Sequence, residues 1–170
     1  MGQSLARNIM QHGFSVSVYN IETEITKQFT QKYPKLFGYE SLEAFVNSLE
    51  KPRKIILMVT AGRVVDSVIA SLKPLLAKGD ILIDCGNSYY EDTQRRMQSM
   101  QQDGFYLIGS GVSGGEKGAL HVPASCPPGN TGPIAKLRTS LLQSLPKMKT
   151  AQLLYLYRKR RLRPFCEDGA

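Results

Sequence analysis

The regular alternation of short apolar runs with helix-like segments is the feature that most constrains the fold of this chain. Strands are expected at residues 14–19, 54–59, 80–84 and 105–109. Helices are expected between them, at residues 22–32, 41–49, 64–76 and 92–102. The runs at 54–59 and 80–84 are continuous, as in strands that are buried on both faces. Strands that alternate with helices across short loops predict an α/β fold with a parallel sheet covered on both faces.

Length and composition are consistent with one globular domain and exclude several other classes. The chain has 170 residues, of which 42% are hydrophobic, enough for a single core. No apolar run reaches the roughly 18 residues that span a bilayer, and the opening MGQSLARNIMQHG has no apolar region typical of a secretory signal. Cys85, Cys126 and Cys166 form no CxxC pair, so we expect neither a disulfide framework nor a metal site. A reducing, cytoplasmic setting is expected.

The positive charge of the chain is concentrated near its C-terminal end. Residues 1–120 hold 13 Lys/Arg and 12 Asp/Glu, whereas residues 121–170 hold 9 and 2. The run Arg158–Arg163 could bind nucleic acid, and the apolar residues before it could contact a membrane surface. A basic run without either function is the interpretation we favour, so we expect no nucleic-acid partner and no membrane partner.

Polar or glycine-rich turns follow four of the expected strands. They lie at residues 19–20, 60–62, 86–88 and 109–115. Because the carboxyl ends of parallel strands share one edge of the sheet, and ligands bind at that edge, these turns predict a binding site. The last turn is rich in glycine, which lets backbone amides approach an anion closely. The pattern therefore favours an anionic ligand.

Three segments in order resemble a known enzyme family. They are Lys54-Ile-Ile-Leu-Met-Val-Thr-Ala-Gly62, Ile83-Asp-Cys-Gly-Asn-Ser88 and Gly109-Ser-Gly-Val-Ser-Gly-Gly-Glu-Lys-Gly-Ala119. Together they resemble the N-terminal coenzyme-binding domain of 6-phosphogluconate dehydrogenase (decarboxylating), continuously to about residue 121. The resemblance implies a Rossmann-like doubly wound parallel sheet. It also implies NADP-dependent oxidative decarboxylation of 6-phosphogluconate to ribulose 5-phosphate in the pentose phosphate pathway and gluconate utilization, by a homodimer.

The resemblance also implies a set of site residues. The cofactor would contact Gly2, Asn20, Val59, Thr60, Ala61 and Asn87. The substrate would contact Asn87, Ser113, Gly114 and Gly115. Such amide and backbone donors can position an anionic hydroxy acid against a nicotinamide, and positioning is a large part of hydride transfer.

The beginning of the chain and the turn after residue 19 depart from the family pattern. Met1-Gly2 match only the end of the family's GLxxMG fingerprint, so we expect the first strand of the sheet to be missing and its neighbours to lack ladder partners. Ile21 stands where the family has an Arg for the 2′-phosphate of NADP, and Glu22 would repel that phosphate. The preference for NADP over NAD is therefore left open.

The last residues match no part of the family's catalytic segment, so no catalytic residue is assigned. The family's general base is a Lys in a GHFVKMVHNG-like segment, and a Glu acts as acid. Synonymous codons for residues 151–170, read one base later, can encode a sequence very close to that segment. We therefore interpret residues 131–170 as a divergent, irregular, frame-shifted basic tail. Residues 1–130 are expected to form the NADP-binding domain.

The sequence predicts a 6-phosphogluconate dehydrogenase-like oxidoreductase fragment that is inactive alone. One alternative is a module that binds nucleotide or 6-phosphogluconate without catalysis. Another is a protein that interacts through its basic tail. A third is a β-hydroxyacid dehydrogenase acting on a smaller acid, which the complete Gly109–Ala119 stretch disfavours.

Overall fold

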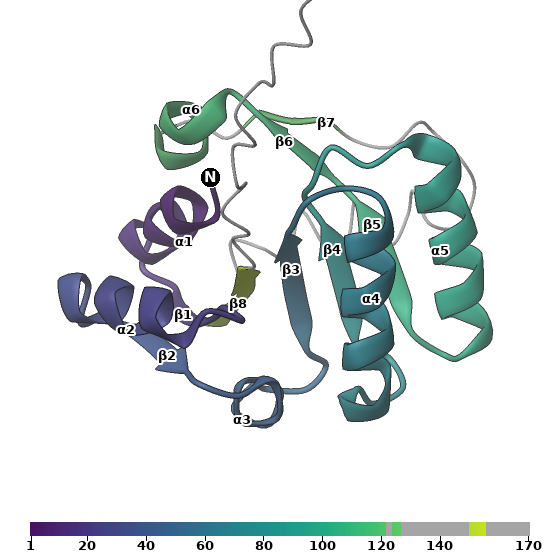
Figure 1. The fold of residues 1–170 in the computed structure, drawn as a ribbon, viewed down its shortest axis with the longest axis horizontal. Helices are drawn as coiled ribbons and strands as arrows, with labels where there is room; N and C mark the ends of the chain where they lie inside the picture. Colours follow the sequence, from purple (N-terminus) through teal and green to yellow (C-terminus); the bar gives the residue numbers. More distant parts are fainter. Residues whose placement is uncertain (122–123, 127–149, 156–170) are drawn as a thin grey trace, which may run out of the picture.

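A parallel six-stranded sheet forms the centre of the molecule (Figure 1). The computed structural model describes residues 1–121, 124–126 and 150–155. The sheet order is β2-β1-β8-β3-β4-β5, and all five neighbouring pairs are parallel. Its strands are β1 (Ser15–Tyr19), β2 (Leu36–Tyr39), β3 (Lys54–Met58), β4 (Ile81–Asp84), β5 (Tyr106–Gly109) and β8 (Thr150–Tyr155). The predicted α/β class and parallel pairing are confirmed.

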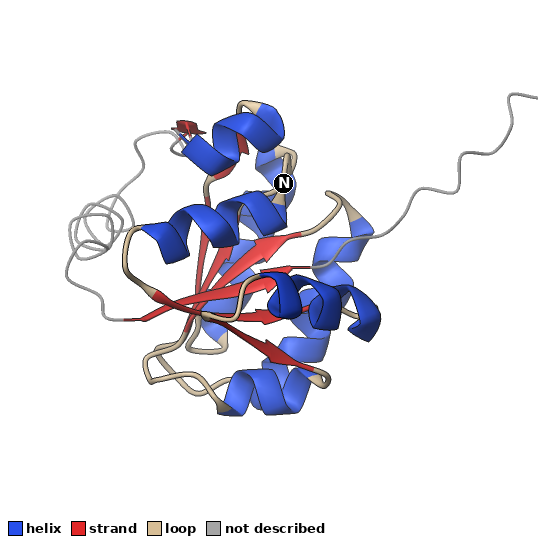
Figure 2. Cartoon of the chain, turned by 90° about the vertical axis from the view of Figure 1, so that its left-hand side faces the viewer, coloured by secondary structure: helices blue, strands red, loops and turns tan. Residues whose placement is uncertain are grey.

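Helices cover both faces of this sheet (Figure 2). They are α1 (Gly2–Gln11), α2 (Thr23–Lys32), α3 (Leu42–Asn47), α4 (Arg63–Leu72), the 3-10 turn η1 (Lys73–Leu75), α5 (Tyr90–Gln102) and α6 (Gly115–His121). Two further short strands, β6 (Gly111–Ser113) and β7 (Ala124–Cys126), pair antiparallel outside the main sheet. No helix of the described residues has the length and hydropathy that a bilayer span requires.

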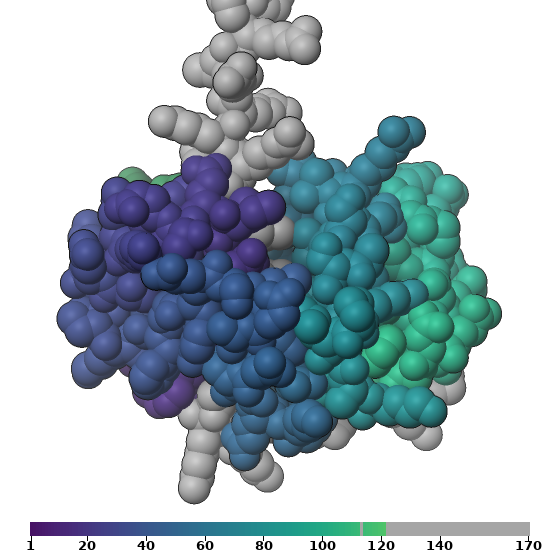
Figure 3. Space-filling view, turned by 60° about the horizontal axis from the view of Figure 1, so that its bottom comes forward, coloured from purple at the N-terminus to yellow at the C-terminus, as the bar shows by residue number. Residues whose placement is uncertain are grey.

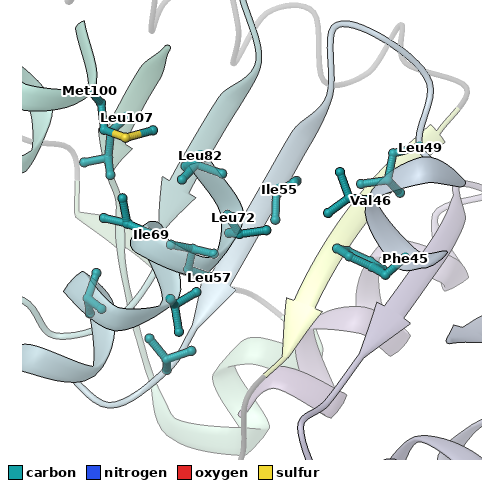
Figure 4. Close-up of a cluster of buried hydrophobic side chains, with 13 residues drawn as sticks. Phe45, Val46, Leu49, Ile55, Leu57, Ile69, Leu72, Leu82, Met100 and Leu107 are labelled. Atoms are coloured by element: carbon teal, nitrogen blue, oxygen red, sulfur yellow. The ribbon is translucent and has the colours of Figure 1, made fainter. Parts of the chain in front are cut away.

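The core consists of one cluster of side chains on each face of the sheet. The cluster shown in Figure 4 joins α3, α4 and α5 to β3, β4 and β5, with Phe45, Leu57 and Leu72 fully buried. The opposite cluster packs α1, α2 and α6 against β1 and β2. In Figure 3, the surface of residues 1–50 lies beside that of α4 and α5. The two faces therefore bury their apolar residues separately, as in a three-layer α/β domain.

A buried ion pair fixes the amino ends of β3 and β4. Arg53 Nη1 lies 2.9 Å from Asp80 Oδ2, and the two side chains are 7% and 1% exposed. The carboxylate of Asp80 also accepts hydrogen bonds from the backbone amides of Arg53 and Ala77. These contacts set the register in which both strands run toward the opposite edge of the sheet.

The centre of the sheet differs from the expectation. β8 lies between β1 and β3 and pairs with both of them. The prediction that these neighbours lack ladder partners is therefore wrong, because Thr150–Tyr155 supplies the missing pairing. These six residues of the expected irregular tail form a strand. The basic run Arg158–Arg163 lies outside the described residues.

Candidate functional site

The turns at the carboxyl edge are joined by backbone hydrogen bonds. The amide of Cys85 donates to the carbonyl of Leu57 (2.9 Å), and the amide of Ser110 donates to that of Asp84 (2.8 Å). A third bond runs from Val112 N to Cys85 O (3.3 Å). The sequence analysis identified the turns after β3, β4 and β5 one by one. These hydrogen bonds join them into one continuous edge of the sheet.

The turn that carries Asn87 is held by the buried carboxylate of Asp84. Its Oδ1 accepts the Gly86 amide at 3.0 Å, and its Oδ2 accepts the Ser88 hydroxyl at 2.6 Å. A Cβ at Gly86 would lie 3.0 Å from the carbonyl oxygen of Val59, so a side chain there would push the two turns apart. Asn87 is exposed between these anchors, which leaves its amide available to a ligand.

Asn20 has an unused hydrogen-bond donor. It follows β1 and is 1% exposed. Its Oδ1 accepts the Glu22 amide at 2.9 Å, whereas its Nδ2 has no partner among the described residues. An unpaired buried amide donor is costly. This donor therefore suits an oxygen of a ligand at the carboxyl edge.

The turn after β3 is fixed by a residue that the sequence did not single out. Arg96, in α5, donates from Nη2 to the carbonyl of Gly62 at 3.0 Å. The same guanidinium is paired with Asp66 in α4. Within this turn Val59 is buried and Thr60 is exposed. Arg96 and Asp84 thus hold the turns of the carboxyl edge through hydrogen bonds. In the sequence they could have been found only as charged residues within or next to apolar segments.

The glycine-rich segment contains a strand and the start of a helix. Ser113 closes β6, and Gly115 begins α6. Gly114 between them has φ +96°, and a Cβ there would lie 3.0 Å from the Cα of Gly118. The structure thus places the expected substrate residues Ser113, Gly114 and Gly115 in a tight strand-to-helix connection.

The start of α1 lies beside this connection. Gly2 is buried in its first turn, and the Met1 amino group is 3.6 Å from Glu116 Oε1. Asn8 Nδ2 donates to the carbonyl of Leu120 at 2.6 Å. Gly2 is thereby held next to α6, on the side of the molecule where the strands end.

Two residues at this edge, Cys85 and Ile21, have no reactive or charged group near pH 7. Burial raises the pKa of the Cys85 thiol to about 12, with the nearby Asp84 carboxylate adding to the rise, so the thiol stays neutral and unreactive near pH 7. Ile21 is 71% exposed and carries no charge for a phosphate. No group of three or more His, Cys, Asp or Glu that could hold a metal ion occurs in the part of the chain that the structure describes.

The comparison with known families decides the identity of this domain. The sequence profile of the NAD binding domain of 6-phosphogluconate dehydrogenase matches residues 1–153. The chain belongs to this family. The match includes β1 to β5, the turns at their carboxyl ends and the glycine-rich segment. It confirms the resemblance drawn from the three sequence motifs.

Curated relatives agree with this assignment. The decarboxylating 6-phosphogluconate dehydrogenase of Chlamydia pneumoniae is 53% identical over 133 residues. Two enzymes of Bacillus subtilis, one NAD(+)-dependent and one NADP(+)-dependent, are 52% and 54% identical. Each match covers 76% of this chain but only 28% of the relative. The chain thus spans little more than a quarter of the length of these enzymes.

Solved structures share the fold. The 6-phosphogluconate dehydrogenase of Plasmodium falciparum, which was solved with NADP+ and with 6-phosphogluconate, gives a TM-score of 0.76 at 34% identity. That match covers 89% of this chain and 32% of the other. The 3-hydroxyisobutyrate dehydrogenase of Mycobacterium tuberculosis gives a TM-score of 0.69 at 18% identity, which supports the fold alone.

The residues at the carboxyl edge fit the dinucleotide of this family. Asn20 offers a buried donor that has no partner in residues 1–121, 124–126 and 150–155, and Gly86 permits close backbone approach. Thr60 and Asn87 are exposed, and they lie on turns that hydrogen bonds with Arg96 and Asp84 hold in place. This donor set suits the hydroxyl, phosphate and amide oxygens of NAD or NADP, and it contains no metal ligand set.

Proposed function

We propose that this chain is a nucleotide-binding unit of the 6-phosphogluconate dehydrogenase type that binds NAD(P) along the carboxyl edge of its sheet. The observation that carries the proposal is the buried Nδ2 of Asn20 at the end of β1, which has no hydrogen-bond partner in the part of the chain that the structure describes. A ligand oxygen at this position would accept a hydrogen bond from the donor. A buried donor without such a bond costs about 1–3 kcal/mol of stability.

Each predicted site residue has a role in this proposal. The nucleotide lies along Gly2, Asn20, Val59, Thr60 and Ala61. Asn87 contacts both the nicotinamide side and the substrate. Ser113, Gly114 and Gly115 hold 6-phosphogluconate through backbone donors. When bound, the nicotinamide supplies the hydride acceptor, while these residues bind and orient the sugar acid.

The coenzyme preference follows from the turn after β1. Ile21 is exposed and uncharged, and Glu22 follows it at the beginning of α2. Neither can pair with a 2′-phosphate, and a carboxylate repels one. We therefore propose that NADP has no advantage over NAD here, although the family includes enzymes that depend on either coenzyme.

The proposal does not extend to catalysis by this chain alone. The family's activity belongs to enzymes of which the chain covers 28%, and no residue of the sequence matches their catalytic Lys. We propose that these residues by themselves bind the coenzyme without turning over. Its cytoplasmic location, the division at residue 130 and the frame-shifted origin of residues 131–170 stay predictions. So does any homodimer, which in this family depends on a further domain.

The first test is a thermal melt of the full chain with and without NAD, NADP and 6-phosphogluconate. A ligand that binds only the folded state raises the melting temperature with concentration. We expect a cooperative melt that shifts upward with NAD and with NADP, and no production of NADPH from 6-phosphogluconate. A melt that none of the three ligands shifts would contradict the binding proposal, and turnover would contradict the proposed inactivity.

A further inference from the structure

Two adjacent tyrosines are exposed to solvent at the carboxyl edge of the sheet. Tyr89 and Tyr90 are 59% and 66% exposed, more than any other aromatic side chain in the part of the chain that the structure describes. Their ring centroids are 4.9 Å apart and their planes make an angle of 62°, which is an edge-to-face contact. Rings of this size keep a large apolar area in water, and a flat ligand stacked on them would cover it.

The tyrosine pair lies beside residues that, on the proposed function, contact the nucleotide. β4 ends at Asp84 and α5 begins at Tyr90, so the pair closes the turn that carries Asn87 (Figure 1). Two residues of chain span at most about 7 Å, so the Cα atom of Tyr89 lies within that distance of the Cα atom of Asn87. The proposed function gives Asn87 the nicotinamide side of the coenzyme, and the tyrosine pair is next to it.

The backbone of Tyr89 is held on both sides. Its carbonyl accepts hydrogen bonds from the amide and the hydroxyl of Thr93, at 3.1 Å and 3.2 Å. The preceding residue, Ser88, donates its hydroxyl to Asp84 at 2.6 Å. The backbone that carries the pair is therefore fixed before a ligand binds, which lowers the entropy that binding costs.

The charges next to the pair favour a cation. Glu91 and Asp92 lie in the first turn of α5, where their carboxylates offset the positive end of the helix dipole. The Tyr90 hydroxyl donates to Glu91 Oε1 at 3.0 Å. The Asp92 carboxylate is paired with Arg95, whereas Glu91 has no cationic partner within the described ranges. A helix start without acids would suit an anion, but aromatic faces beside a carboxylate attract positive charge.

We propose that Tyr89 and Tyr90 form a stacking site for a planar organic cation, which, on the proposed function, is the oxidised nicotinamide ring. That ring is flat and carries a positive charge in NAD+, and it loses this charge in NADH. A cation over the face of a tyrosine is attracted by the quadrupole of the ring, and the Glu91 carboxylate adds to the attraction. The site therefore favours the oxidised coenzyme over the reduced one.

Nucleotide titration of the full chain tests this site. Tyr89→Leu and Tyr90→Leu are combined in one variant, because both side chains are exposed and Tyr89 makes no side-chain capping hydrogen bond to α5. The matched control, Tyr106→Leu, removes a ring that is 42% exposed at the start of β5, on the opposite edge of the sheet. Calorimetry with NAD+, NADH and ADP-ribose compares both variants with the wild type, and thermal melts confirm that all three proteins fold. ADP-ribose lacks only the nicotinamide ring.

We expect the double variant to bind NAD+ about fivefold more weakly than the wild type, NADH less than about twofold more weakly, and ADP-ribose equally well. The Tyr106→Leu control should match the wild type with all three ligands. An equal loss for NAD+ and ADP-ribose, or for NAD+ and NADH, would overturn the inference. Unchanged binding of NAD+ to the double variant would overturn the stacking site alone, whereas a wild type that binds none of the three would contradict the proposed function as well.

Nuclear magnetic resonance gives a test that does not depend on the folding of the double variant. Stacking on a tyrosine face shifts the nicotinamide protons of bound NAD+ upfield. Tyr90→Phe keeps the ring and removes only the hydroxyl, so it should keep this shift and bind NAD+ nearly as tightly as the wild type. Nicotinamide protons that do not shift when NAD+ binds to the wild type would overturn the proposal.

Discussion

Arg96 and Asp66 join α5 to α4 through two hydrogen bonds of one guanidinium. Nε donates to Oδ1 at 2.9 Å and Nη2 donates to Oδ2 at 2.8 Å. The Arg96 side chain is only 2% exposed, whereas that of Asp66 is 37% exposed. Because Nη2 also donates to the carbonyl of Gly62, the pair fixes the turn that leads from β3 to α4.

The first prediction removes the charge of this carboxylate. Asp66→Asn leaves the buried Arg96 cation without its partner, and we expect it to cost about 2 kcal/mol, below the range for a fully buried pair because Asp66 is partly exposed. Urea denaturation of the full chain measures the loss. Asp92→Asn is the matched control, because it breaks only the exposed contacts with Arg95 and a 4.0 Å contact with Arg96. Equal losses in the two variants would contradict a bracing role for Asp66.

The second prediction concerns acid stability. Hydrogen bonds from Arg96 lower the pKa of Asp66 from 3.8 to about 2, against the opposing effect of burial. A carboxyl whose pKa is depressed by folding stabilises the native state above its unfolded pKa, and this contribution is lost as the pH falls through the folded value. The difference in unfolding free energy between wild type and Asp66→Asn should therefore be constant above about pH 5 and shrink between pH 4 and 2. A difference that stays constant down to pH 2 would contradict the pairing.

The third prediction tests the connection before α6. Gly114→Ala combines a positive φ with a Cβ contact of 3.0 Å to the Cα of Gly118, whereas Gly13→Ala has φ +87° and open space around its Cβ. We expect Gly13→Ala to cost about 1 kcal/mol from backbone strain alone, and Gly114→Ala to cost more. Thermal melts measure both costs. A smaller loss for Gly114→Ala would show that α6 shifts freely away from the connection.

The fourth prediction concerns the coenzyme. Ile21→Arg places a guanidinium on an exposed position after β1, where a 2′-phosphate would lie in the proposed mode of binding. A charge-assisted hydrogen bond should strengthen NADP binding about tenfold, or about 1.4 kcal/mol, and leave NAD binding unchanged. Calorimetric titration with each nucleotide measures the effect. An equal gain for both would indicate general attraction of phosphate and contradict a specific contact at this position.

The sequence predicted the parts of the fold that local pattern determines. The apolar runs of β3 and β4 are long enough to indicate strands buried on both faces. The helix expected at residues 41–49 forms as α3, which Ser41 caps by accepting the Ala44 amide at 3.1 Å. β2 was not predicted, because Leu36–Tyr39 is a short edge strand interrupted by Gly38. α6 was not predicted either, since glycine disfavours helices, and packing of Ala119 against α1 outweighs that preference.

The arrangement of the site was only partly predictable. Glycines and polar residues at strand ends located the turns, because strand ends share an edge whatever the details of packing. The bracing by Asp84 and Arg96 depends on contacts between distant elements, such as the bond from α5 to Gly62. The pairing of β8 is also long-range, and no local pattern indicates that Thr150–Tyr155 lies between β1 and β3.

The central claim is that NAD(P) binds at the edge where the buried Nδ2 of Asn20 lacks a partner among the residues that the structure describes. Asn20→Asp keeps the acceptor for the Glu22 amide but replaces the unpartnered Nδ2 with a carboxylate oxygen. Asn47→Asp makes the same charge change at the exposed end of α3, at the opposite edge of the sheet. Calorimetric titration of the full chain with NAD compares the three proteins. We predict measurable binding to the wild type and to Asn47→Asp, and at least tenfold weaker binding to Asn20→Asp. Equal affinity in all three would contradict this site, and no binding to the wild type would contradict the function proposed for the chain.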